Sequence, residues 1–469
     1  MKKEVDVAII GAGSAGLYAL SQVKKDTDSF LLINEGPYGT TCARVGCMPS
    51  KSLIRIAEYY HERAYFEKSG IHNSEQLTVS IPDVLKRVRK HRDILVEGNI
   101  KNITRLGDKV LSGRAEFIDT HRLKVGDDEI VAKKIIIATG STPVVNPKWK
   151  AFKEHILTTD ELFEQEDLPS TLGVLGLGVI GLELGQALSR LGIKVTAVHS
   201  KEFIGGLSDP AVNKNMLQLC EKEFDIWLGG GHAVLTKVED KIKISTDENE
   251  VLVDKVLVAI GRKPNLASLK LENLGIALDK RGMPRFDPQT MQVEDLPIYI
   301  AGDVNADRPL LHEAADEGRI AGHNVVKDQK KFKRKVPLAI VFTDPNIAFV
   351  GKSYKEIKDN SNILTASYDF KQQGRAFLIN KNAGLCHLYV EKSEGKLVGA
   401  QMVAPGGEHL AHHLAWAMEQ ELTVYNMLAL PFYHPTLEEG LYALLRDAVK
   451  KLGHKKASIL EIPFLDEAE

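Results

Sequence analysis

The sequence predicts an α/β protein with two Rossmann-like dinucleotide-binding domains and an α+β domain at its carboxyl end. Two glycine fingerprints carry the first part of this prediction, because each follows an apolar strand and precedes a helix. They begin at Gly11 and Gly176, about 165 residues apart. The last 130 or so residues carry the second part, because short apolar strands alternate there with helical segments.

The first fingerprint contains the residues that a dinucleotide-binding turn requires. Gly11 permits a tight turn, Gly13 lets the backbone approach a pyrophosphate, and Gly16 lets the helix pack against the strand. The amino terminus of the helix then faces the phosphates. The next apolar strand is followed by Glu35, at the distance where an acid accepts hydrogen bonds from a ribose.

The second fingerprint repeats this spacing with Gly176, Gly178 and Gly181, and Glu183 follows inside the next helix. The strand after it ends in His199, so the sequence has no carboxylate where a ribose ligand is expected. One fingerprint alone is a weak signal. Two in strand and helix context favour two nucleotide sites over two ordinary turns.

Composition limits the classes of partner. The chain has 469 residues, 43% apolar and 26% charged, which is typical of a globular protein of two to four domains. Its net charge of −2 favours neither nucleic acid nor an acidic membrane as a partner. No apolar run approaches the roughly 20 residues of a membrane helix, and the amino-terminal segment does not resemble a secretory signal. Four cysteines are too few for a disulfide scaffold, so we expect a cytoplasmic location.

The most informative stretch contains Cys42 and Cys47, shortly after the first fingerprint. Two thiols at this spacing can cycle between a disulfide and a dithiol. A straight helix would separate their Cα atoms by about 7.5 Å along its axis, whereas a disulfide requires roughly 4.4–6.8 Å. We therefore expect a distorted first helical turn, which Gly46 and Pro49 permit.

Near the carboxyl end, His434 precedes a Pro-Thr turn and Glu439 follows at the start of a helix. An imidazole can take a proton from a thiol and later return it, provided its ring is held in one tautomer. Glu439 can fold back to the other ring nitrogen. His434 as the base and Glu439 as the group that orients it then have the arrangement expected around an activated thiol nucleophile.

Together these motifs resemble the flavin-dependent pyridine nucleotide–disulfide oxidoreductases over essentially the whole chain, and within that family the dihydrolipoamide dehydrogenases most. The match is specific because six motifs occur in the family's order at plausible intervals. The motifs are Gly11-x-Gly13-x-x-Gly16, Cys42 to Cys47 with Pro49-Ser50-Lys51, Ala138-Thr139-Gly140, Gly176-x-Gly178-x-x-Gly181-x-Glu183, Ala301-Gly302-Asp303 and His434-Pro435-Thr436 with Glu439.

The resemblance implies bound FAD and NAD, with NADP left open, and an obligate homodimer. It also implies four segments along the chain. These are an FAD-binding domain over 1–145, an NAD(P)-binding domain over 146–265, a central segment over 266–336 that completes the FAD site, and an interface domain over 337–469 that forms the dimer.

The resemblance also assigns roles to residues. Cys47 would lie against the flavin, Cys42 would exchange with the substrate, and His434 of the opposite subunit would be the acid–base, oriented by Glu439. The implied FAD-binding residues are Gly11, Gly13, Gly16, Glu35, Thr41, Lys51, Ala115, Thr139, Gly140, Ser141, Asp303 and Leu311. The implied NAD-binding residues are Gly176, Gly178, Val179, Ile180, Gly181, Glu183, His199, Gly261 and Arg262.

Five positions depart from the dihydrolipoamide dehydrogenase pattern. Thr40 and Arg44 lie in the cysteine loop, Asp344 replaces a histidine, and Phe432 stands where a second histidine precedes the base. His199 leaves the choice between NAD and NADP open, because the usual acid repels a 2′-phosphate and a histidine does not.

The implied reaction is oxidation of a dihydrolipoyl dithiol, carried by a 2-oxo acid dehydrogenase complex, with reduction of NAD⁺. Two alternatives stay open: an NAD(P)H-dependent reductase of another, glutathione-like disulfide, and a nucleotide-sensing flavoprotein without turnover. A glutathione reductase matches less well, because Val179 replaces its gating tyrosine. A mercuric reductase needs a carboxyl-terminal cysteine pair, and no cysteine follows Cys386.

Three further features are expected to be structural. Cys220 and Cys386 have no partner motif and are expected in the core. The basic run over 330–335 is expected to be a solvated connector. We expect a packed helix and no metal at three histidines whose helical spacing could hold zinc, namely His409, His412 and His413.

Overall fold

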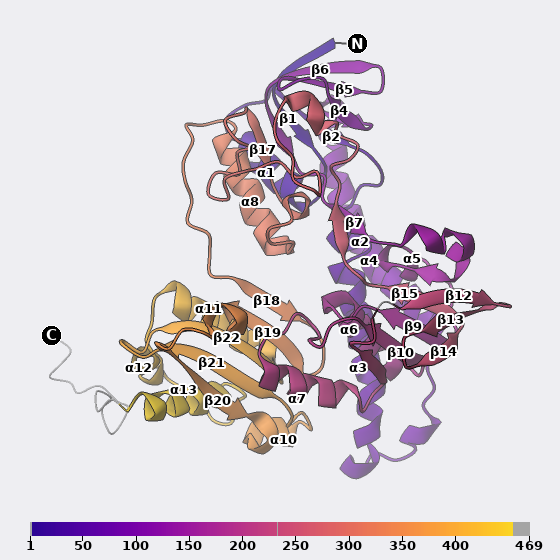
Figure 1. Ribbon diagram of the computed structural model, residues 1–469, viewed down its shortest axis with the longest axis vertical. Coiled ribbons are helices and arrows are strands. Elements are labelled where there is room, and N and C mark those ends of the chain that lie inside the picture. Colours follow the sequence, from indigo (N-terminus) through magenta and orange to yellow (C-terminus); the bar gives the residue numbers. More distant parts are fainter. Residues whose placement is uncertain (1, 232, 454–469) are drawn as a thin grey trace.

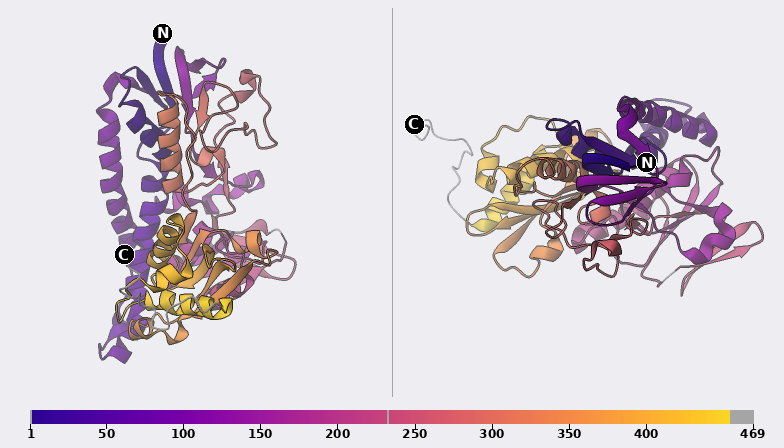
Figure 2. Two further views of the ribbon diagram at one scale, coloured as in Figure 1. Left: turned by 90° about the vertical axis from the view of Figure 1, so that its left-hand side faces the viewer. Right: turned by 90° about the horizontal axis from the view of Figure 1, so that it is seen from above.

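The computed structural model describes residues 2–231 and 233–453. Figure 1 shows three layered units: a sheet with the amino terminus at the top, a second sheet at the lower right and a third at the lower left. The view from above in Figure 2 places the two lower units on opposite sides of the first. The predicted fold class is confirmed, with two dinucleotide-binding units and an α+β unit.

The first unit is a seven-stranded sheet in the order β3-β2-β1-β6-β5-β4, with β17 also paired to β6. The strands β2, β1, β6 and β17 are parallel, and their carboxyl ends lie at one edge, because Ile10 pairs with both Ile33 and Ile137. Its elements are β1 (Lys2–Ile10), α1 (Ser14–Val23), β2 (Phe30–Asn34), α2 (Thr41–Arg44), α3 (Cys47–Glu62), α4 (Ile81–Thr104), β3 (Val110–Ser112), β4 (Ala115–Phe117), β5 (Arg122–Val125), β6 (Asp128–Ile137), β7 (Ser141–Pro143), β17 (Ile298–Ile300) and α8 (Leu311–Asn324).

The second unit is a five-stranded parallel sheet in the order β11-β10-β9-β15-β8. A three-stranded antiparallel sheet, β12-β13-β14, covers it, and the sequence analysis did not anticipate this sheet. The elements are β8 (Ile156–Leu157), α5 (Thr159–Leu162), β9 (Thr171–Leu175), α6 (Val179–Arg190), β10 (Lys194–His199), α7 (Pro210–Cys220), β11 (Asp225–Leu228), β12 (Val234–Val238), β13 (Lys241–Ser245), β14 (Glu250–Val253), β15 (Lys255–Val258) and β16 (Arg262–Pro264).

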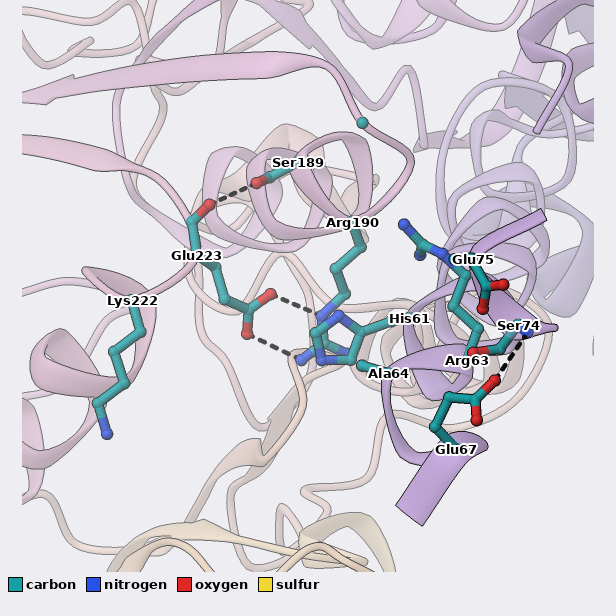
Figure 3. A pocket seen from close by; sticks show the side chains of 11 residues that line it. His61, Arg63, Ala64, Glu67, Ser74, Glu75, Ser189, Arg190, Lys222 and Glu223 are labelled. Carbon is teal, nitrogen blue, oxygen red and sulfur yellow. Dashed lines mark hydrogen bonds and ion pairs between the residues drawn. The ribbon is translucent and has the colours of Figure 1, made fainter. Parts of the chain in front are cut away.

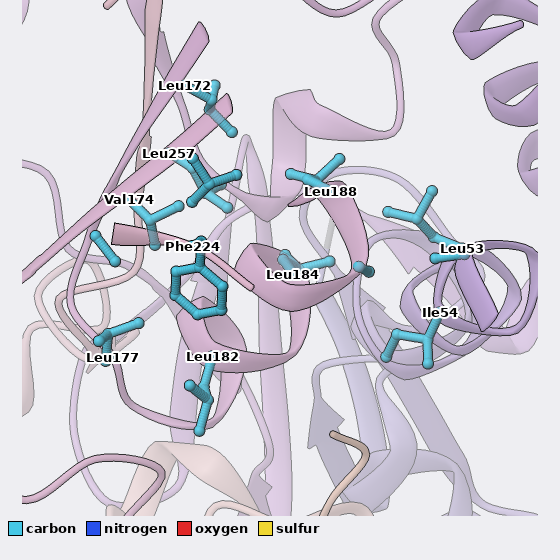
Figure 4. Packing of buried hydrophobic residues seen from close by; sticks show 14 of the residues in the cluster. Leu53, Ile54, Leu172, Val174, Leu177, Leu182, Leu184, Leu188, Phe224 and Leu257 are labelled. Atoms are coloured by element: carbon cyan, nitrogen blue, oxygen red, sulfur yellow. The ribbon is translucent and has the colours of Figure 1, made fainter. Parts of the chain in front are cut away.

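The helix that starts at the redox motif shares a core with the second unit. Leu53 of α3 packs in one cluster with Leu184 and Leu188 of α6 and with Leu172 of β9 (Figure 4). Each fully buried leucine contributes roughly 1.5–3 kcal/mol to folding. This shared core fixes α3 against α6, and so fixes the cysteine motif relative to the second dinucleotide turn.

The third unit is an antiparallel sheet in the order β18-β19-β22-β21-β20, packed against helices at one side. Cys386 is buried here and Cys220 in the second unit, as expected for core thiols. The elements are β18 (Leu338–Val341), β19 (Asn346–Gly351), α9 (Tyr354–Ile357), β20 (Ile363–Asp369), α10 (Gly374–Leu378), β21 (Leu385–Glu391), β22 (Leu397–Ala404), α11 (Gly407–Glu419), α12 (Val424–Leu428) and α13 (Glu439–Leu452).

A long segment over 325–337 without helix or strand, which we call the strap, joins α8 to β18 (left side of Figure 1). It contains the basic run that we expected to be solvated. The expectation is wrong for Arg334, whose side chain is only 11% exposed because it inserts between two acidic residues of α8. Within residues 2–231 and 233–453, no helix is both long and apolar enough to cross a membrane.

Candidate redox site and dinucleotide-binding turns

The first glycine turn has the shape that a pyrophosphate requires. Gly11 has a φ of +113°, and a methyl group on it would lie 2.2 Å from the Ala138 carbonyl oxygen. A methyl group on Gly16 would lie 1.9 Å from the Gly11 carbonyl oxygen, so helix and strand are in contact. Gly13 faces open space among the described residues and caps α1 without a side-chain acceptor. The first N–H groups of α1 are therefore free to bind an anion.

The second turn repeats this construction. Gly176 has a φ of +92°, and a methyl group on it would lie 2.5 Å from the Ala259 carbonyl oxygen. A methyl group on Gly181 would lie 1.8 Å from the Gly176 carbonyl oxygen. Gly178 is open among the described residues and caps α6, again without a side-chain acceptor. Both turns therefore fit a dinucleotide.

The predicted FAD residues gather at the carboxyl edge of the first sheet. Ser141 Oγ donates to Asp303 Oδ2 at 3.0 Å, and Arg262 Nε donates to Ser141 Oγ at 2.8 Å. The Arg262 contact arises because β16 pairs with β7. Glu35 lies at the same edge, after β2, and forms an ion pair with Arg114 at 2.6 Å. One predicted FAD residue and one predicted NAD residue are thus hydrogen-bonded to each other.

The remaining predicted FAD residues are placed by these elements. Thr139 and Gly140 form the turn after β6, and Ala115 is buried at the start of β4. Leu311 begins α8, with its side chain partly exposed. Thr41 begins α2, beside the cysteines.

Two asparagines that the sequence analysis missed hold these turns. Asn34 Oδ1 accepts from the Ala12 N–H at 3.0 Å, inside the first glycine turn. Asn265 Nδ2 donates to the Thr139 carbonyl oxygen at 2.9 Å, and Thr139 Oγ1 donates back to the Asn265 carbonyl oxygen. Asn34 is the last residue of β2 and Asn265 directly follows β16, but neither asparagine belongs to a glycine motif.

His199 lies at the carboxyl end of β10, but both of its ring nitrogens are already bonded. Nδ1 accepts from the Leu177 N–H at 3.2 Å, and Nε2 lies 3.1 Å from the Phe203 carbonyl oxygen. Because a carbonyl oxygen only accepts, Nε2 carries the proton and the ring is neutral. Burial lowers the pKa of His199, which also favours the neutral ring. Val179 and Ile180 form the first turn of α6, beyond this histidine.

The cysteine motif is split between two helices. The chain leaves α2 after Arg44, turns at Val45 and Gly46, and enters α3 at Cys47. A methyl group on Gly46 would lie 3.0 Å from the Thr41 carbonyl oxygen and 3.2 Å from the Cys42 Cα atom. The expected distortion is therefore a complete break, and Gly46 permits the close approach of α2 to α3.

Thr40 explains one departure from the family pattern. Its φ is +63°, a conformation that a β-branched residue rarely adopts. Its Oγ1 accepts from the Ala43 N–H at 3.2 Å and so caps α2. The hydroxyl thus stabilises the short helix that carries Cys42, at the cost of backbone strain.

The two thiols polarise each other. The hydrogen bond from the Cys42 thiol and the positive charge of Lys51 together lower the pKa of Cys47 to about 7, against the opposing effect of burial. The same hydrogen bond and burial raise the pKa of Cys42. In the dithiol state Cys47 is therefore the sulfur that ionises first.

Lys51 joins this motif to the second unit. Its Nζ lies 2.8 Å from Glu183 Oε2 of α6 and 4.6 Å from the centre of the Phe342 ring. Glu183 is only 4% exposed, and it also accepts from the Phe342 N–H at 2.8 Å. One buried carboxylate therefore connects the cysteine helix, the second dinucleotide turn and the third unit.

The carboxyl-terminal pair also forms. His434 Nδ1 lies 2.9 Å from Glu439 Oε1, and the Thr436 N–H donates to Glu439 Oε2 at 3.0 Å. The hydrogen bond with His434 lowers the pKa of Glu439. The His434 side chain is 81% exposed, and its described contacts include neither cysteine. Glu439 is the first residue of α13. Figure 1 shows α13 and α2, the helix that contains Cys42, on different sides of the third unit.

The departure at Asp344 has a structural explanation. Its Oδ2 accepts from Arg190 Nη1 at 2.9 Å and from Lys381 Nζ at 2.6 Å. Burial alone would raise the pKa of Asp344, but Lys381 and Arg190 hold it below its usual range. Gln186 of α6 exchanges hydrogen bonds with the Asp344 backbone. Asp344 thus docks the third unit onto α6.

A cavity of about 480 Å³ lies beside this network, between the end of α3 and α6 (Figure 3). Its lining includes His61, Arg63 and the Arg190–Glu223 ion pair. Burial and the Arg190 charge lower the pKa of His61. None of the predicted cofactor or catalytic residues lines this cavity.

Two of the three histidines of α11 pack against neighbouring groups, whereas the His409 side chain is 72% exposed. His412 Nδ1 bonds to the Glu408 carbonyl oxygen, and the rings of His412 and His413 both pack edge-on to Trp416. Among the described residues, no group of three or more metal-binding side chains is placed to hold an ion.

Comparison with known proteins identifies the family. Residues 5–318 match the pyridine nucleotide-disulphide oxidoreductases, and residues 337–444 match the dimerisation domain of the same family. The chain belongs to this family. As in its relatives, the cofactors of this pyridine nucleotide–disulfide oxidoreductase are FAD and NAD, which fit the two open glycine turns. The dimerisation domain supports a homodimer.

Curated relatives of this oxidoreductase include two dihydrolipoyl dehydrogenases. That of Haloferax volcanii is 30% identical over 96% of this chain and 97% of its own length. That of Geobacillus stearothermophilus is 30% identical over 93% of this chain and 94% of its own length.

Among solved structures, the HOCl-induced flavoprotein disulfide reductase RclA of Escherichia coli, as its Cu(II) complex, matches with a TM-score of 0.84. It is 25% identical and covers 95% of this chain and 99% of its own. LpdA of Mycobacterium tuberculosis matches with a TM-score of 0.83 at 26% identity, over 94% of this chain and 99% of its own.

Proposed function

We propose that this oxidoreductase oxidises a dihydrolipoyl dithiol and reduces NAD⁺, and that Cys42 and Cys47 are its redox pair. The observation that carries the proposal is the position of these thiols. They lie on helices whose core and Lys51–Glu183 ion pair tie them to the second dinucleotide turn. Dihydrolipoyl dehydrogenases among the relatives support the dithiol class.

In the dithiol step, the oxidised protein carries a Cys42–Cys47 disulfide. His434 removes a proton from one substrate thiol, and the thiolate attacks Cys42 Sγ. The Cys42–Cys47 bond breaks, and Cys47 leaves as a thiolate, which its pKa of about 7 favours. The second substrate thiol releases its proton to solvent, and its thiolate attacks the substrate sulfur that is bound to Cys42. This closes the substrate disulfide, and Cys42 leaves as a thiolate and takes back the proton that His434 holds.

The protein then holds a Cys42 thiol and a Cys47 thiolate, the ionisation order that the structure favours. Bound flavin supplies the two-electron chemistry that links this dithiol to the pyridine nucleotide. Lys51 stabilises the Cys47 thiolate by its charge. Asp303 and the first glycine turn bind FAD, and the second glycine turn binds NAD.

The proton step requires a second subunit. Within one chain His434 is exposed and has no described contact with the cysteines, although Glu439 already holds its ring. We propose that His434 of one subunit serves Cys42 of the other, in an obligate homodimer formed by the interface domain. The four free cysteines fit a reducing, cytoplasmic setting, and the lipoyl group would belong to a 2-oxo acid dehydrogenase complex.

A second candidate is NAD(P)H-dependent reduction of another disulfide. The likeness to RclA, a flavoprotein disulfide reductase, favours it. The uncharged ring of His199 also stands where the usual acid would repel the 2′-phosphate of NADPH, so this position does not exclude NADPH. A nucleotide-sensing flavoprotein is less well supported, because Cys42, Cys47 and the His434–Glu439 pair are all in place.

Steady-state kinetics separate these functions. We expect the highest kcat/KM with dihydrolipoamide and NAD⁺, and loss of turnover in Cys42→Ser and Cys47→Ser. A higher kcat/KM for glutathione disulfide or coenzyme A disulfide with NADH or NADPH would replace the first proposal with the second. An FAD-loaded protein that turns over none of these substrates would leave the sensing function.

A further inference from the structure

The Arg334 side chain of the strap is only 11% exposed, and it contacts two glutamates of α8, the helix that follows the turn carrying Asp303. Its Nη2 donates to Glu317 Oε1 at 2.9 Å and to Glu313 Oε2 at 2.6 Å. We propose that Arg334 is a positioning residue for FAD binding: it holds Glu317, and Glu317 holds the backbone turn on which Asp303 sits. This inference rests on the proposed role of Asp303 as a flavin ligand, and it is independent of the disulfide or dithiol substrate.

Glu317 connects the arginine to the turn. Its Oε2 accepts from the Gly302 N–H and from Asn305 Nδ2, both at 2.7 Å, while Oε1 faces Arg334. Gly302 and Asn305 flank Asp303 on both sides, because the turn consists of Gly302 followed by a short helix over Asp303–Asn305. One carboxylate therefore holds the backbone before the proposed flavin ligand and the Asn305 side chain after it.

The turn cannot relax freely if this clamp is lost. Gly302 has a φ of +83°, and a methyl group on it would lie 2.8 Å from Ala15 Cβ of α1. The turn is thus pressed against the helix that follows the first glycine turn. A small displacement of Gly302 would change how Asp303 faces that helix and its phosphate-binding end.

The charges explain why an arginine is needed. Glu317 is fully buried, and burial raises its pKa despite three hydrogen-bond donors. Glu313 is also buried, but Arg334 and Arg308 together hold its pKa below its usual range. Without Arg334, Glu317 keeps no cationic partner among its described contacts, and a buried carboxylate without one either protonates or moves toward water.

The strap also ties this clamp to the interface domain. Two residues after Arg334, the Val336 N–H donates to Glu419 Oε2 of α11 at 2.8 Å. Arg334 is the buried exception in its run, since its neighbours Lys333 and Lys335 are 77% and 71% exposed. The strap therefore inserts one side chain beneath the flavin turn just before it enters the third unit.

The test uses the full-length dimer and measures the dissociation constant for FAD by flavin fluorescence on dilution. We expect Arg334→Met to raise it about 10- to 100-fold, by analogy with the range seen when a group that orients a metal ligand is removed. Lys333→Met, one position away and exposed, is the matched control and should leave it within about twofold. Asp303→Asn tests the flavin site itself and should also raise it.

A rescue variant separates positioning from a general loss of stability. In Glu317→Gln combined with Arg334→Met, the amide oxygen can still accept from Gly302 and no buried charge is left unpaired. We expect this double variant to bind FAD at least about fivefold more tightly than Arg334→Met.

If Arg334→Met does not fold, Arg334→Lys replaces it. A lysine keeps the charge but not the planar guanidinium that reaches both carboxylates, and it should raise the dissociation constant about three- to tenfold. The proposal is overturned if the folded Arg334 variant binds FAD within twofold of the wild type, or if the double variant binds no better than Arg334→Met. Weakened binding in Arg334→Met with unchanged binding in Asp303→Asn would overturn the route through Asp303.

Discussion

The Nζ atom of Lys51 lies 2.8 Å from Glu183 Oε2, and this contact joins the helix that begins at Cys47 to the helix that Gly178 caps. The ion pair is buried on the glutamate side, so it is screened little by solvent. Cys47 is therefore close to the positive charge of Lys51, which lowers its pKa, and to the negative charge of Glu183, which raises it. The helix that carries Cys47 and the helix of the second dinucleotide turn are therefore joined directly by one ion pair.

The first prediction concerns the ionisation of Cys47. In the two-electron-reduced holoprotein, the long-wavelength band between the Cys47 thiolate and the flavin should appear as the pH rises through about 7, because the thiolate is the donor. Lys51→Met should move this midpoint upward, because the lysine charge favours the thiolate. Absorbance titration gives both midpoints. A wild-type midpoint above about 9, or equal midpoints in the two proteins, would contradict the assignment.

The second prediction separates the two halves of the reaction. His434→Ala should slow reduction of the protein by dihydrolipoamide about 10²–10⁴-fold, the usual range for a positioned acid–base. Reduction of the flavin by NADH should be unaffected, because that step does not use the thiol proton. Glu439→Gln should slow the same half less, since it removes only the group that orients the ring. Stopped-flow measurements of each half test this, and equal losses in both halves would refute the role of His434.

The sequence predicted those parts of the fold that local rules determine. Gly11, Gly16, Gly176 and Gly181 could be interpreted because a tight turn and a close helix leave no room for a side chain. The spacing of His434 and Glu439 likewise predicted a contact that lies within one turn. In both cases the interacting groups are close in sequence, so spacing alone restricts their geometry.

The sequence could not predict contacts between distant segments. Arg334 stands in a run of lysines that looks solvated, and its partners lie on a helix before the strap. The sequence shows that Asp344 replaces a histidine of the family pattern. Its pairing with Arg190 depends on how the second and third units dock. His199 was expected to face the nucleotide, and only the fold shows that Leu177 and Phe203 occupy both ring nitrogens.

The third prediction concerns the docking of the third unit. Asp344→Asn should lower the free energy of unfolding by about 3 kcal/mol near pH 7, because it removes the carboxylate that Arg190 and Lys381 share, which leaves Arg190 with Glu223 alone and Lys381 with Glu62 at 3.9 Å. The pKa of Asp344 is lower in the folded protein than in the unfolded chain, so this stabilisation is present above the ordinary pKa of 3.8 and is lost as the pH falls through the folded value.

Denaturant unfolding at fixed protein concentration, at pH 7 and at about pH 3, checks this prediction. The difference between the wild type and Asp344→Asn should shrink at the lower pH. The exposed Asp359→Asn serves as the control and should change stability by less than about 0.5 kcal/mol. A difference that grows toward low pH would show that the sign of the Asp344 contribution is wrong.

The fourth prediction concerns the choice of coenzyme. Because His199 is neutral and both ring nitrogens are bonded, it neither repels nor attracts a 2′-phosphate. We expect the wild type to prefer NADH over NADPH only modestly, as measured by the ratio of the two kcat/KM values. His199→Glu should raise this ratio about tenfold or more, because an acid repels the 2′-phosphate and accepts hydrogen bonds from the ribose. An unchanged ratio in His199→Glu would show that this position does not face the ribose.

The claim that the redox cysteines and the imidazole belong to opposite subunits is tested most directly with mixed dimers. We expect the Cys42→Ser protein to have no activity with dihydrolipoamide and the His434→Ala protein to keep about 1% or less. The two proteins are unfolded and refolded together in equal amounts. About half of the resulting dimers pair one subunit of each kind, and each such dimer has one complete site if the partners act across the interface. The account predicts recovery of roughly a quarter of the wild-type activity. Activity no greater than that of the two parent proteins, with mixed dimers present, would contradict it.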